Sequence, residues 1–512
     1  MKKIYSRISL YFTLATFLIG ACSEDFLNRT PPSVFTEINY FKNVDELETG
    51  LVACFAMLRS GFVFDHWMTD DLNSDDADCG SSPGDQPLLY DISYSRMKPS
   101  SDYMWYFWSD YYSVIARCNE VIDRSAGTKG DPVEIEKIVD QAKYLRALSY
   151  YHLVSTYGDV PLVNRFLNPE ELKLRRAPVE EIWTQIESDL KDATILPTVS
   201  NWNESGRVTS GAVYSLLGKV YLTRKKYQLA NAAFQKVVSS GEYQLVPDYG
   251  FIFRHEGENC AESVFEIQHK TNIPDGNLGT YSETFRMPRD YAAGGWGFDT
   301  PTKDLLNEFE PGDPRIIYTF IFPGDVFPAQ KEGTTFTVEC FESPTGYNAR
   351  KVWIPWSERA GLNMLEYDYN CRYMRYAEVL LLYAESLNEL NKQDSARMLV
   401  NMVRARARNT PITDPQRVSC AYDLSYTGEL LPDITGSNQS ELRKAIWHEQ
   451  RVELAIEGQR RSMLLRTGQF KARMEAAKAY AGVSVEPHEL LFPIPEFEIN
   501  STNGMITQNP GY

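Results

Sequence analysis

The stretch YSLLGKVYLTRKKYQLANAAF, residues 214–234, decides the fold of this chain. It places Tyr214, Leu217, Gly218 and Tyr221 at the spacing of the first helix of a tetratricopeptide repeat, with Tyr in the place of the usual Trp. Ala230 and Phe234 supply the A-x-x-x-F pattern of the second helix, and only the closing Pro is missing. Because a small residue at position 218 lets one helix approach its hairpin partner, the stretch predicts a tightly packed helix pair.

A degenerate second copy of this pattern lies about 166 residues further along the chain. There Ala384 stands in the place of Gly218, Leu387 in the place of Tyr221 and Ala396 in the place of Ala230. Repeats of this kind stack so that each hairpin buries its apolar face against the next one. The sequence therefore predicts a mainly α fold, a tetratricopeptide-like, α-solenoid-like scaffold that a large insertion interrupts.

Further amphipathic patterns flank the two copies. Helices are expected over residues 44–59, 104–125, 135–157, 178–196, 373–390, 394–408 and 440–457. Between the copies, residues 240–369 are richer in Gly, Pro and aromatic residues and mostly lack the 3.6-residue period, so we expect an irregular, loop-rich insertion there. Short strands are expected within it, over residues 263–268, 316–322, 335–340 and 352–354.

The N-terminus has the layout of a secretory signal. Lys2, Lys3 and Arg7 precede an apolar run over residues 8–19, which is too short for an ordinary membrane span. The pair Gly20-Ala21 ahead of Cys22 resembles a bacterial lipobox, whose cysteine is lipidated and becomes the first residue of the mature chain; the alternative is simple cleavage that leaves Cys22 free. We therefore predict a signal peptide over 1–21, a lipid anchor and proline-marked tether over 22–34, and a single domain over 35–512 with its scaffold over about 35–240 and 370–512.

Composition and charge exclude some classes of ligand. The formal net charge is −17, and removal of a leader that carries three basic residues would take it to −20. Nucleic-acid binding needs Lys and Arg to displace counterions from phosphates, so a nucleic-acid partner is not expected. The seven cysteines other than Cys22 are widely spaced, and they predict neither a disulfide framework nor a metal knuckle.

A sugar-binding face should combine exposed aromatic side chains with short polar ones on loops, because sugar rings stack through their C–H faces and their hydroxyls need hydrogen-bond partners. Two regions fit this chemistry. The first runs from Trp67 to the acidic residues Asp70 and Asp71 and to Asn73, and the second holds Tyr281, Arg289, Tyr291 and Trp296. Glycines on both sides leave Trp296 little local cover, which makes it the leading candidate for a stacking contact; packing in the core or within the loop is the alternative for each aromatic residue.

Other chemistries have weaker support. Asp71, Asn73 and Asp75 follow the D-x-N-x-D spacing of a calcium loop, but that loop's Gly and closing Glu are absent, and no metal or cofactor is predicted. The pentapeptide GSSPG, residues 80–84, matches a nucleophile elbow in letters only, since no apolar strand precedes it and Pro83 obstructs the following helix. A glycosidase needs only two suitably separated carboxylates, so a hydrolase stays open as an alternative.

Several short motifs, taken in order, resemble the SusD/RagB family of outer-membrane nutrient-uptake lipoproteins over nearly the whole chain. They are RCNEVI (117–122), AKYLRA (142–147), YGDVPL (157–162), GRVT (206–209), YAEVLLLYAE (376–385), EQRVELAIEGQRR (449–461), PIP (493–495) and QNPGY (508–512). Each motif is weak alone, but their order together with the lipobox is specific. The same resemblance links the acidic run at residues 23–25 to export signals of surface lipoproteins and places Trp296 where the founding starch binder carries a ligand-stacking Trp.

The resemblance implies a surface-exposed, outer-membrane lipoprotein that binds an oligo- or polysaccharide without catalysis. It also implies a partner, a SusC-like TonB-dependent transporter that the protein caps. The alternatives are a surface glycoside hydrolase and a structural or peptide-binding repeat lipoprotein. The sequence does not specify the glycan or its linkage.

Overall fold

The computed structural model describes residues 40–59, 66–82, 84–202, 204–273, 276–289, 293–340, 343–359, 366–436 and 438–512. Within these ranges the chain is mostly helical, and its strands form five small antiparallel pairs. None of the helices in the described part of the chain is both long enough and apolar enough to cross a bilayer. The mainly α prediction is confirmed.

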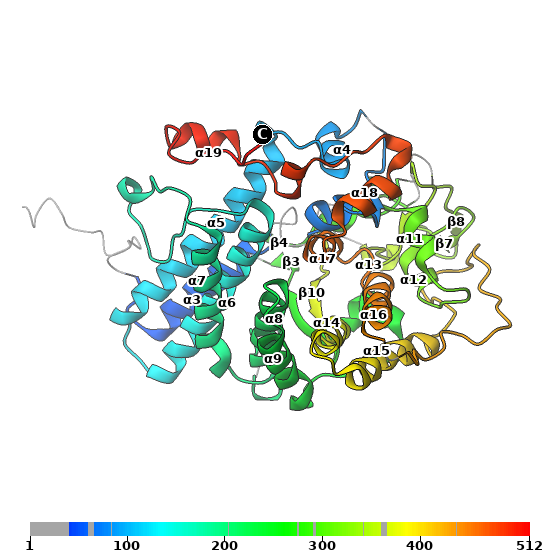
Figure 1. Ribbon diagram of the computed structural model, residues 1–512, viewed down its shortest axis with the longest axis horizontal. Coiled ribbons are helices and arrows are strands. Elements are labelled where there is room, and N and C mark those ends of the chain that lie inside the picture. The colour runs from blue at the N-terminus through cyan, green and yellow to red at the C-terminus, as the bar shows by residue number, and fades with distance from the viewer. Residues whose placement is uncertain are drawn as a thin grey trace, which may run out of the picture.

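The scaffold is a succession of helices in which each packs against the next, and Figure 1 shows them as an arc from α3 and α5 to α15 and α16. Their bounds are α3 Val44–Met57, α5 Asp102–Arg124, α6 Pro132–Tyr157, α7 Val179–Asp192, α8 Ser210–Thr223, α9 Tyr227–Ser240, α14 Tyr376–Glu389, α15 Gln393–Arg408 and α16 Gln439–Glu453. Local signals set several ends: Gly158 closes α6 at a φ of 75°, and Asn438 caps α16.

The two repeat copies form the neighbouring hairpins α8–α9 and α14–α15, and α9 packs directly against α14. A Cβ atom at Gly218 would lie 2.5 Å from the ring of Phe234, so glycine is what permits the close approach within the first hairpin. Ala384 and Ala396 are fully buried in the second hairpin. The tetratricopeptide-like prediction is therefore confirmed, and the two copies lie side by side despite their separation in sequence.

The remaining elements lie between and around these hairpins. They are the π-helix Trp67–Leu72 and the helices α4 Pro87–Ser93, α10 Ser282–Arg286, α11 Lys303–Glu308, α12 Ile316–Thr319, α13 Trp356–Arg359, α17 Arg460–Thr467, α18 Phe470–Ala477 and α19 Glu496–Ser501. The paired strands are β1 Ala77–Asp78 with β5 Thr300–Pro301, β2 Ser263–Ile267 with β10 Cys371–Arg375, β3 Lys270–Ile273 with β4 Gly276–Leu278, β6 Phe320–Ile321 with β9 Asn348–Ala349, and β7 Val326–Pro328 with β8 Thr335–Thr337.

Three of the expected strands are wrong in whole or in part. Of residues 335–340, only Thr335–Thr337 form a strand, β8. Residues 316–319 form the helix α12, and only Phe320 and Ile321 are extended, because a short apolar run that is buried throughout has no periodicity to separate strand from helix. Residues 352–354 are not a strand: the amide of Trp353 closes a turn on the carbonyl of Arg350. Helix α16 also ends four residues early, before Ile456 and Gly458 adopt positive φ.

Ionic groups lie deep inside the packed helices. Arg315 is fully buried and contacts Asp313, Glu449 and Glu453 at 2.5–2.9 Å. Glu453 also accepts from Arg375 at 2.6 Å and pairs with Arg406. Burial alone would raise the pKa of Glu453, but these three arginines outweigh it and hold that pKa well below its usual range. The carboxylate therefore stays ionised and ties α12, β10, α15 and α16 together.

A histidine at the edge of this region makes stability depend on pH. His448 of α16 lies 2.8 Å from Glu308 and 3.4 Å from Glu310. Burial alone would lower its pKa, but the hydrogen bonds to the two carboxylates prevail and raise the pKa to about 9. A raised folded-state pKa means that the stabilisation is complete below the unfolded-state value of about 6.5 and is lost as pH rises through 9.

We therefore expect His448→Gln to destabilise the protein by about 1–2 kcal/mol at pH 6, with a much smaller effect at pH 9.5. Urea unfolding of both proteins at the two pH values measures this difference. His255→Gln, at an exposed site, controls for removal of a histidine as such. An equal destabilisation at both pH values would contradict the role of the charged imidazole.

Candidate functional site

The acidic segment after Trp67 lies inside the protein, which corrects the expectation that it faces a ligand. The Asp70 carboxylate accepts from the amide of Ser462 at 2.9 Å, and Asp71 accepts from the amide of Gly458 at 2.9 Å. Asn73 donates to the carbonyl of Ile92 and accepts from Arg461 at 2.8 Å. Asp71 and Asn73 are fully buried and Asp70 is nearly so, so their polar atoms bind the protein itself.

The neighbouring aspartates have the same role. Asp75 contacts Arg460, Arg451 and Arg473 at 2.7–3.1 Å, and Asp76 contacts Arg451 at 2.8 Å. Burial alone would raise the pKa of Asp75, yet Arg451 and Arg460 outweigh it and hold the pKa far below its usual range. Arginine side chains thus pair with the aspartates of the D-x-N-x-D pattern. No cluster of three metal-ligating side chains occurs in the ranges that the structure describes.

Trp67 is likewise fully buried, so it presents no face to a sugar in this structure. Its ring packs 5.9 Å from the ring of Phe285, at the start of the π-helix. Sequence reasoning placed Trp67 on an exposed loop because polar residues follow it. Those polar residues are instead hydrogen-bonded to partners from the C-terminal region, and so the whole segment is buried in the core.

Two other predicted aromatics meet on the same Phe285 and remain partly exposed. Trp296 packs edge-to-face on Phe285 with 4.4 Å between ring centroids, and Tyr281 lies 5.9 Å from it. The amide of Trp296 donates to the carbonyl of Thr284 at 2.8 Å, and the amide of Gly297 donates to that of Met287 at 2.8 Å. The Trp296 loop is therefore fixed to α10, and its ring has a defined position over the core.

Arg289 adds a polar group next to this loop. Its guanidinium contacts Ser81 and Asp85, and the side chains of Arg289 and Asp85 are each about one-third exposed. The contact depends on a close backbone approach, because a Cβ at Gly80 would lie 1.7 Å from the carbonyl oxygen of Gly297. Glycine at position 80 thus lets the 79–82 loop lie against the Trp296 loop.

Trp356 of α13 is a further aromatic residue at the site, and it was not among the predicted site residues. A Cβ at Gly294 would lie 3.3 Å from its ring, and Arg359 stacks on the same ring at 4.5 Å. Trp356 is partly exposed. Sequence alone gave no usable signal for Trp356, Ser81 or Asp85, because they join the site through backbone contacts between distant loops.

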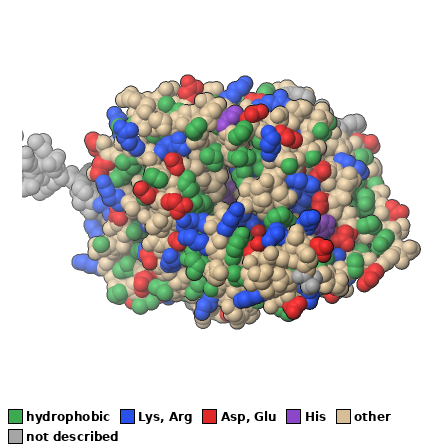
Figure 2. Space-filling model, viewed as in Figure 1, with side chains coloured by type: hydrophobic (Ala, Val, Ile, Leu, Met, Phe, Trp, Pro, Cys, Tyr) green, Lys and Arg blue, Asp and Glu red, His purple; other side chains and the backbone are tan. Residues whose placement is uncertain are grey.

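These residues define one surface, which we call the Trp296 face: Ser81, Asp85, Tyr281, Arg289, Trp296 and Trp356. Its three aromatic rings, its carboxylate and its guanidinium are partly exposed or exposed, whereas Ser81 is buried and its hydroxyl bonds to Asp85 and Arg289. Tyr291 and Cys22 lie outside the described residues. Basic and acidic side chains are mixed over the face of the molecule that Figure 2 shows, rather than gathered into a basic stripe of the kind that polyanions bind.

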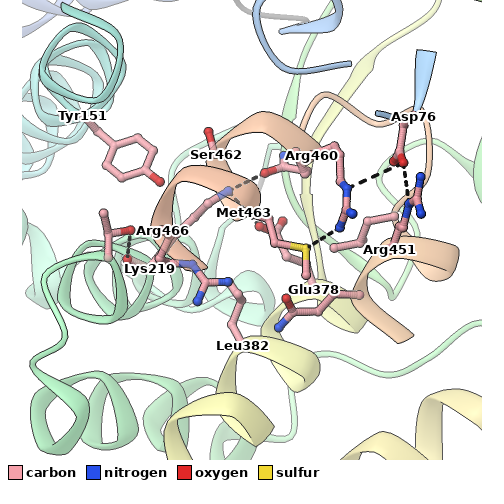
Figure 3. Close-up of a pocket in the computed structure, with 14 residues that line it drawn as sticks. Asp76, Tyr151, Lys219, Glu378, Leu382, Arg451, Arg460, Ser462, Met463 and Arg466 are labelled. Atoms are coloured by element: carbon pink, nitrogen blue, oxygen red, sulfur yellow. Dashed lines mark hydrogen bonds and ion pairs between the residues drawn. The ribbon is translucent and has the colours of Figure 1, made fainter. Parts of the chain in front are cut away.

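A separate polar cavity lies between α6, α8, α14 and α17. Lys219 extends into it and donates to Glu378 at 2.8 Å and to Gln459 at 2.5 Å, with Tyr151 and Arg466 nearby (Figure 3). Its volume is about 30 Å³, which suits a water molecule and is far too small for a sugar ring. The buried lysine therefore joins α8 to α14.

Comparison with known proteins gives consistent matches. Residues 261–512 match the family model described as SusD family, and residues 25–222 match the model described as starch-binding associating with outer membrane. SusD-like protein P2 of Formosa agariphila is 26% identical over the full length of both chains. The starch-binding protein SusD of Bacteroides thetaiotaomicron is 22% identical, over 84% of this chain and 81% of its own length.

Solved structures agree with these matches. A laminarin binding SusD-like protein is 28% identical with a TM-score of 0.74, over 92% of this chain and all of the other. Surface glycan-binding protein A from Bacteroides thetaiotaomicron, in complex with laminarihexaose, has a TM-score of 0.73 at 23% identity, over 91% of this chain and 99% of the other, and shows the shared fold.

Proposed function

This chain belongs to the SusD family of outer-membrane-associated glycan-binding proteins, and from that premise we propose that it captures an oligo- or polysaccharide on its Trp296 face and delivers it to a SusC-like TonB-dependent transporter. The observation that carries the proposal is the convergence of Tyr281, Trp296 and Trp356, partly exposed, with Arg289, Ser81 and Asp85. Trp67 packs on Phe285 inside the core, and Asp70, Asp71 and Asn73 bind other parts of the protein. Tyr291, in the same loop as Trp296, is a further proposed contact.

The chemistry of the face suits a hydroxylated ligand. The C–H faces of a pyranose pack on flat aromatic rings, while the carboxylate and guanidinium hydrogen-bond to its hydroxyls. The loops are fixed by backbone hydrogen bonds and by the close approach at Gly80, so the rings are held in place before the ligand arrives. Such preorganisation lowers the entropic cost of binding.

A β-glucan is the first ligand to test, because the 28% identical structural relative is described as laminarin binding. We expect one of laminarin, starch and xylan to bind the purified protein in calorimetric titration, and no shorter product to form on prolonged incubation. Chromatography of the same mixtures measures the products. Release of shorter saccharides would support a glycoside hydrolase instead, and no binding to any glycan would favour a structural or peptide-binding role.

We further propose that the domain over residues 35–512 is held at the outer membrane by a lipid on Cys22, after removal of residues 1–21. A nutrient-binding protein needs a partner to move its ligand across the membrane, and the anchor keeps it beside the transporter. Two acyl chains anchor stably, whereas one binds only marginally. We expect Cys22→Ala to move most of the protein from the membrane to the soluble fraction in cells that lack the transporter, with Cys54→Ala as the control. Full retention of the Cys22 variant in the membrane would contradict the anchor.

A further inference from the structure

A second surface in this protein has the composition of a sugar-binding site and lies apart from the Trp296 face. Trp105 and Tyr106, at the start of α5, are 37% and 39% exposed, and Phe497 of α19 is 62% exposed. The rings of Trp105 and Phe497 lie 5.8 Å apart in an edge-to-face arrangement. Figure 1 shows α19, in red, at the upper edge of the molecule, and α19 packs against α5.

The rings of Trp105 and Phe497 border a preformed hollow of about 410 Å³, which is otherwise lined by residues 99–102, 495, 496 and 500. The amide of Glu496 donates to the carbonyl of Pro99 at 2.9 Å, which joins the two lining segments. A volume of this size lies within the range of small-molecule sites and admits a short saccharide. The hollow is therefore a fixed feature of the fold.

Four polar side chains around this hollow make no hydrogen bond or ion pair within the described part of the chain. They are those of Ser100, Asp102, Glu496 and Asn500, and all four are exposed. The acidic segment around Asp75 is the opposite case, since arginines and backbone amides occupy its carboxylates. A hydroxyl, two carboxylates and an amide beside exposed rings match the hydrogen-bonding pattern of a neutral sugar.

We propose that this hollow, the Trp105 face, is a second saccharide-binding site, which binds the same glycan chain as the Trp296 face. The proposal rests on the proposed function for the identity of the ligand. The two faces are linked through Gln86 and Tyr103: Gln86 follows Asp85 of the first face and accepts from the Tyr103 hydroxyl at 3.4 Å, and the Tyr103 ring lies 6.3 Å from that of Tyr106. A polysaccharide bound at both faces gains from effective concentration, so losing one face should weaken polysaccharide binding about tenfold or more while affecting a short oligosaccharide less.

Fluorine NMR of the full-length chain labelled with 5-fluorotryptophan tests the two faces separately. The Trp105 and Trp296 signals are assigned with Trp105→Phe and Trp296→Phe, and the buried Trp67 signal serves as an internal control. The probes are laminarihexaose, maltohexaose and xylohexaose. We expect one of them to shift both the Trp105 and Trp296 signals, and Phe497→Ala to remove the shift at Trp105 alone.

The outcomes distinguish this inference from the proposed function. A shift at Trp296 alone overturns the second site and leaves the proposed function intact. A shift at Trp105 alone supports a saccharide site at the Trp105 face, but it removes the Trp296 face and overturns the binding of one glycan chain by both faces. If no probe shifts the Trp105 signal, the inference is overturned. If the purified transporter shifts that signal instead, the Trp105 face is a protein interface.

Discussion

Replacing Glu453 with Gln is expected to lower the free energy of unfolding by about 3–5 kcal/mol. The side chain is fully buried and contacts Arg315, Arg375 and Arg406. Glutamine has the same shape but no charge, and its amide would face guanidinium groups that cannot lose their protons. The three arginines would keep their other carboxylate partners but lose the one anion that they share, and water cannot replace it in the core. Equilibrium unfolding in urea measures the loss.

Glu134→Gln is the matched control, since it makes the same chemical change in an exposed pair with Lys137. Exposed pairs contribute about 0–1 kcal/mol, so this variant should be close to the wild type. Equal stability of the Glu453 and Glu134 variants would show that the buried arginines find sufficient partners elsewhere in the network.

The two tryptophans of the same aromatic cluster are expected to respond in opposite ways to truncation. Trp67→Ala empties a fully buried site beside Phe285 and should cost about 3–5 kcal/mol of stability. Trp296→Ala removes a partly exposed ring and should instead cost about 2 kcal/mol of glycan affinity, roughly thirtyfold. Thermal melts and calorimetry of both variants with the cognate glycan measure the two quantities.

Glycan affinity that survives Trp296→Ala unchanged would remove this residue from the site. A Trp67→Ala variant that melts like the wild type would show that the π-helix can close over the space left by the ring.

The helical scaffold was predictable because its signals are local. The spacing of Gly218, Ala230 and Phe234 alone predicts a tight hairpin. Gly158 predicts a helix end because glycine readily adopts the positive φ found there. The insertion was harder, since residues 316–319 are buried on all sides and their backbone conformation depends on tertiary contacts.

The site was predictable only in part, for a physical reason. Flanking glycines suggested an accessible Trp296, whose ring is partly exposed, whereas the run of aspartates suggested a hydrated loop. Whether a carboxylate faces water or an arginine depends on partners far away in sequence: Asp75 and Arg460 are separated by 385 residues. A single sequence does not reveal such pairings, and so Asp70, Asp71 and Asn73 were assigned to the wrong side of the surface.

The same pairings constrain the order in which the chain can fold. Asp70, Asp71, Asn73, Asp75 and Asp76 find their partners between residues 451 and 473, near the end of the chain. A chain that emerges from its N-terminus must hold these four carboxylates and the Asn73 amide in water until the last elements arrive, because without partners they cannot enter the core. Contacts of such high sequence separation make folding slow. Chains truncated before residue 451 should consequently remain open at the π-helix, and folding should finish only after the last part of the chain has been released.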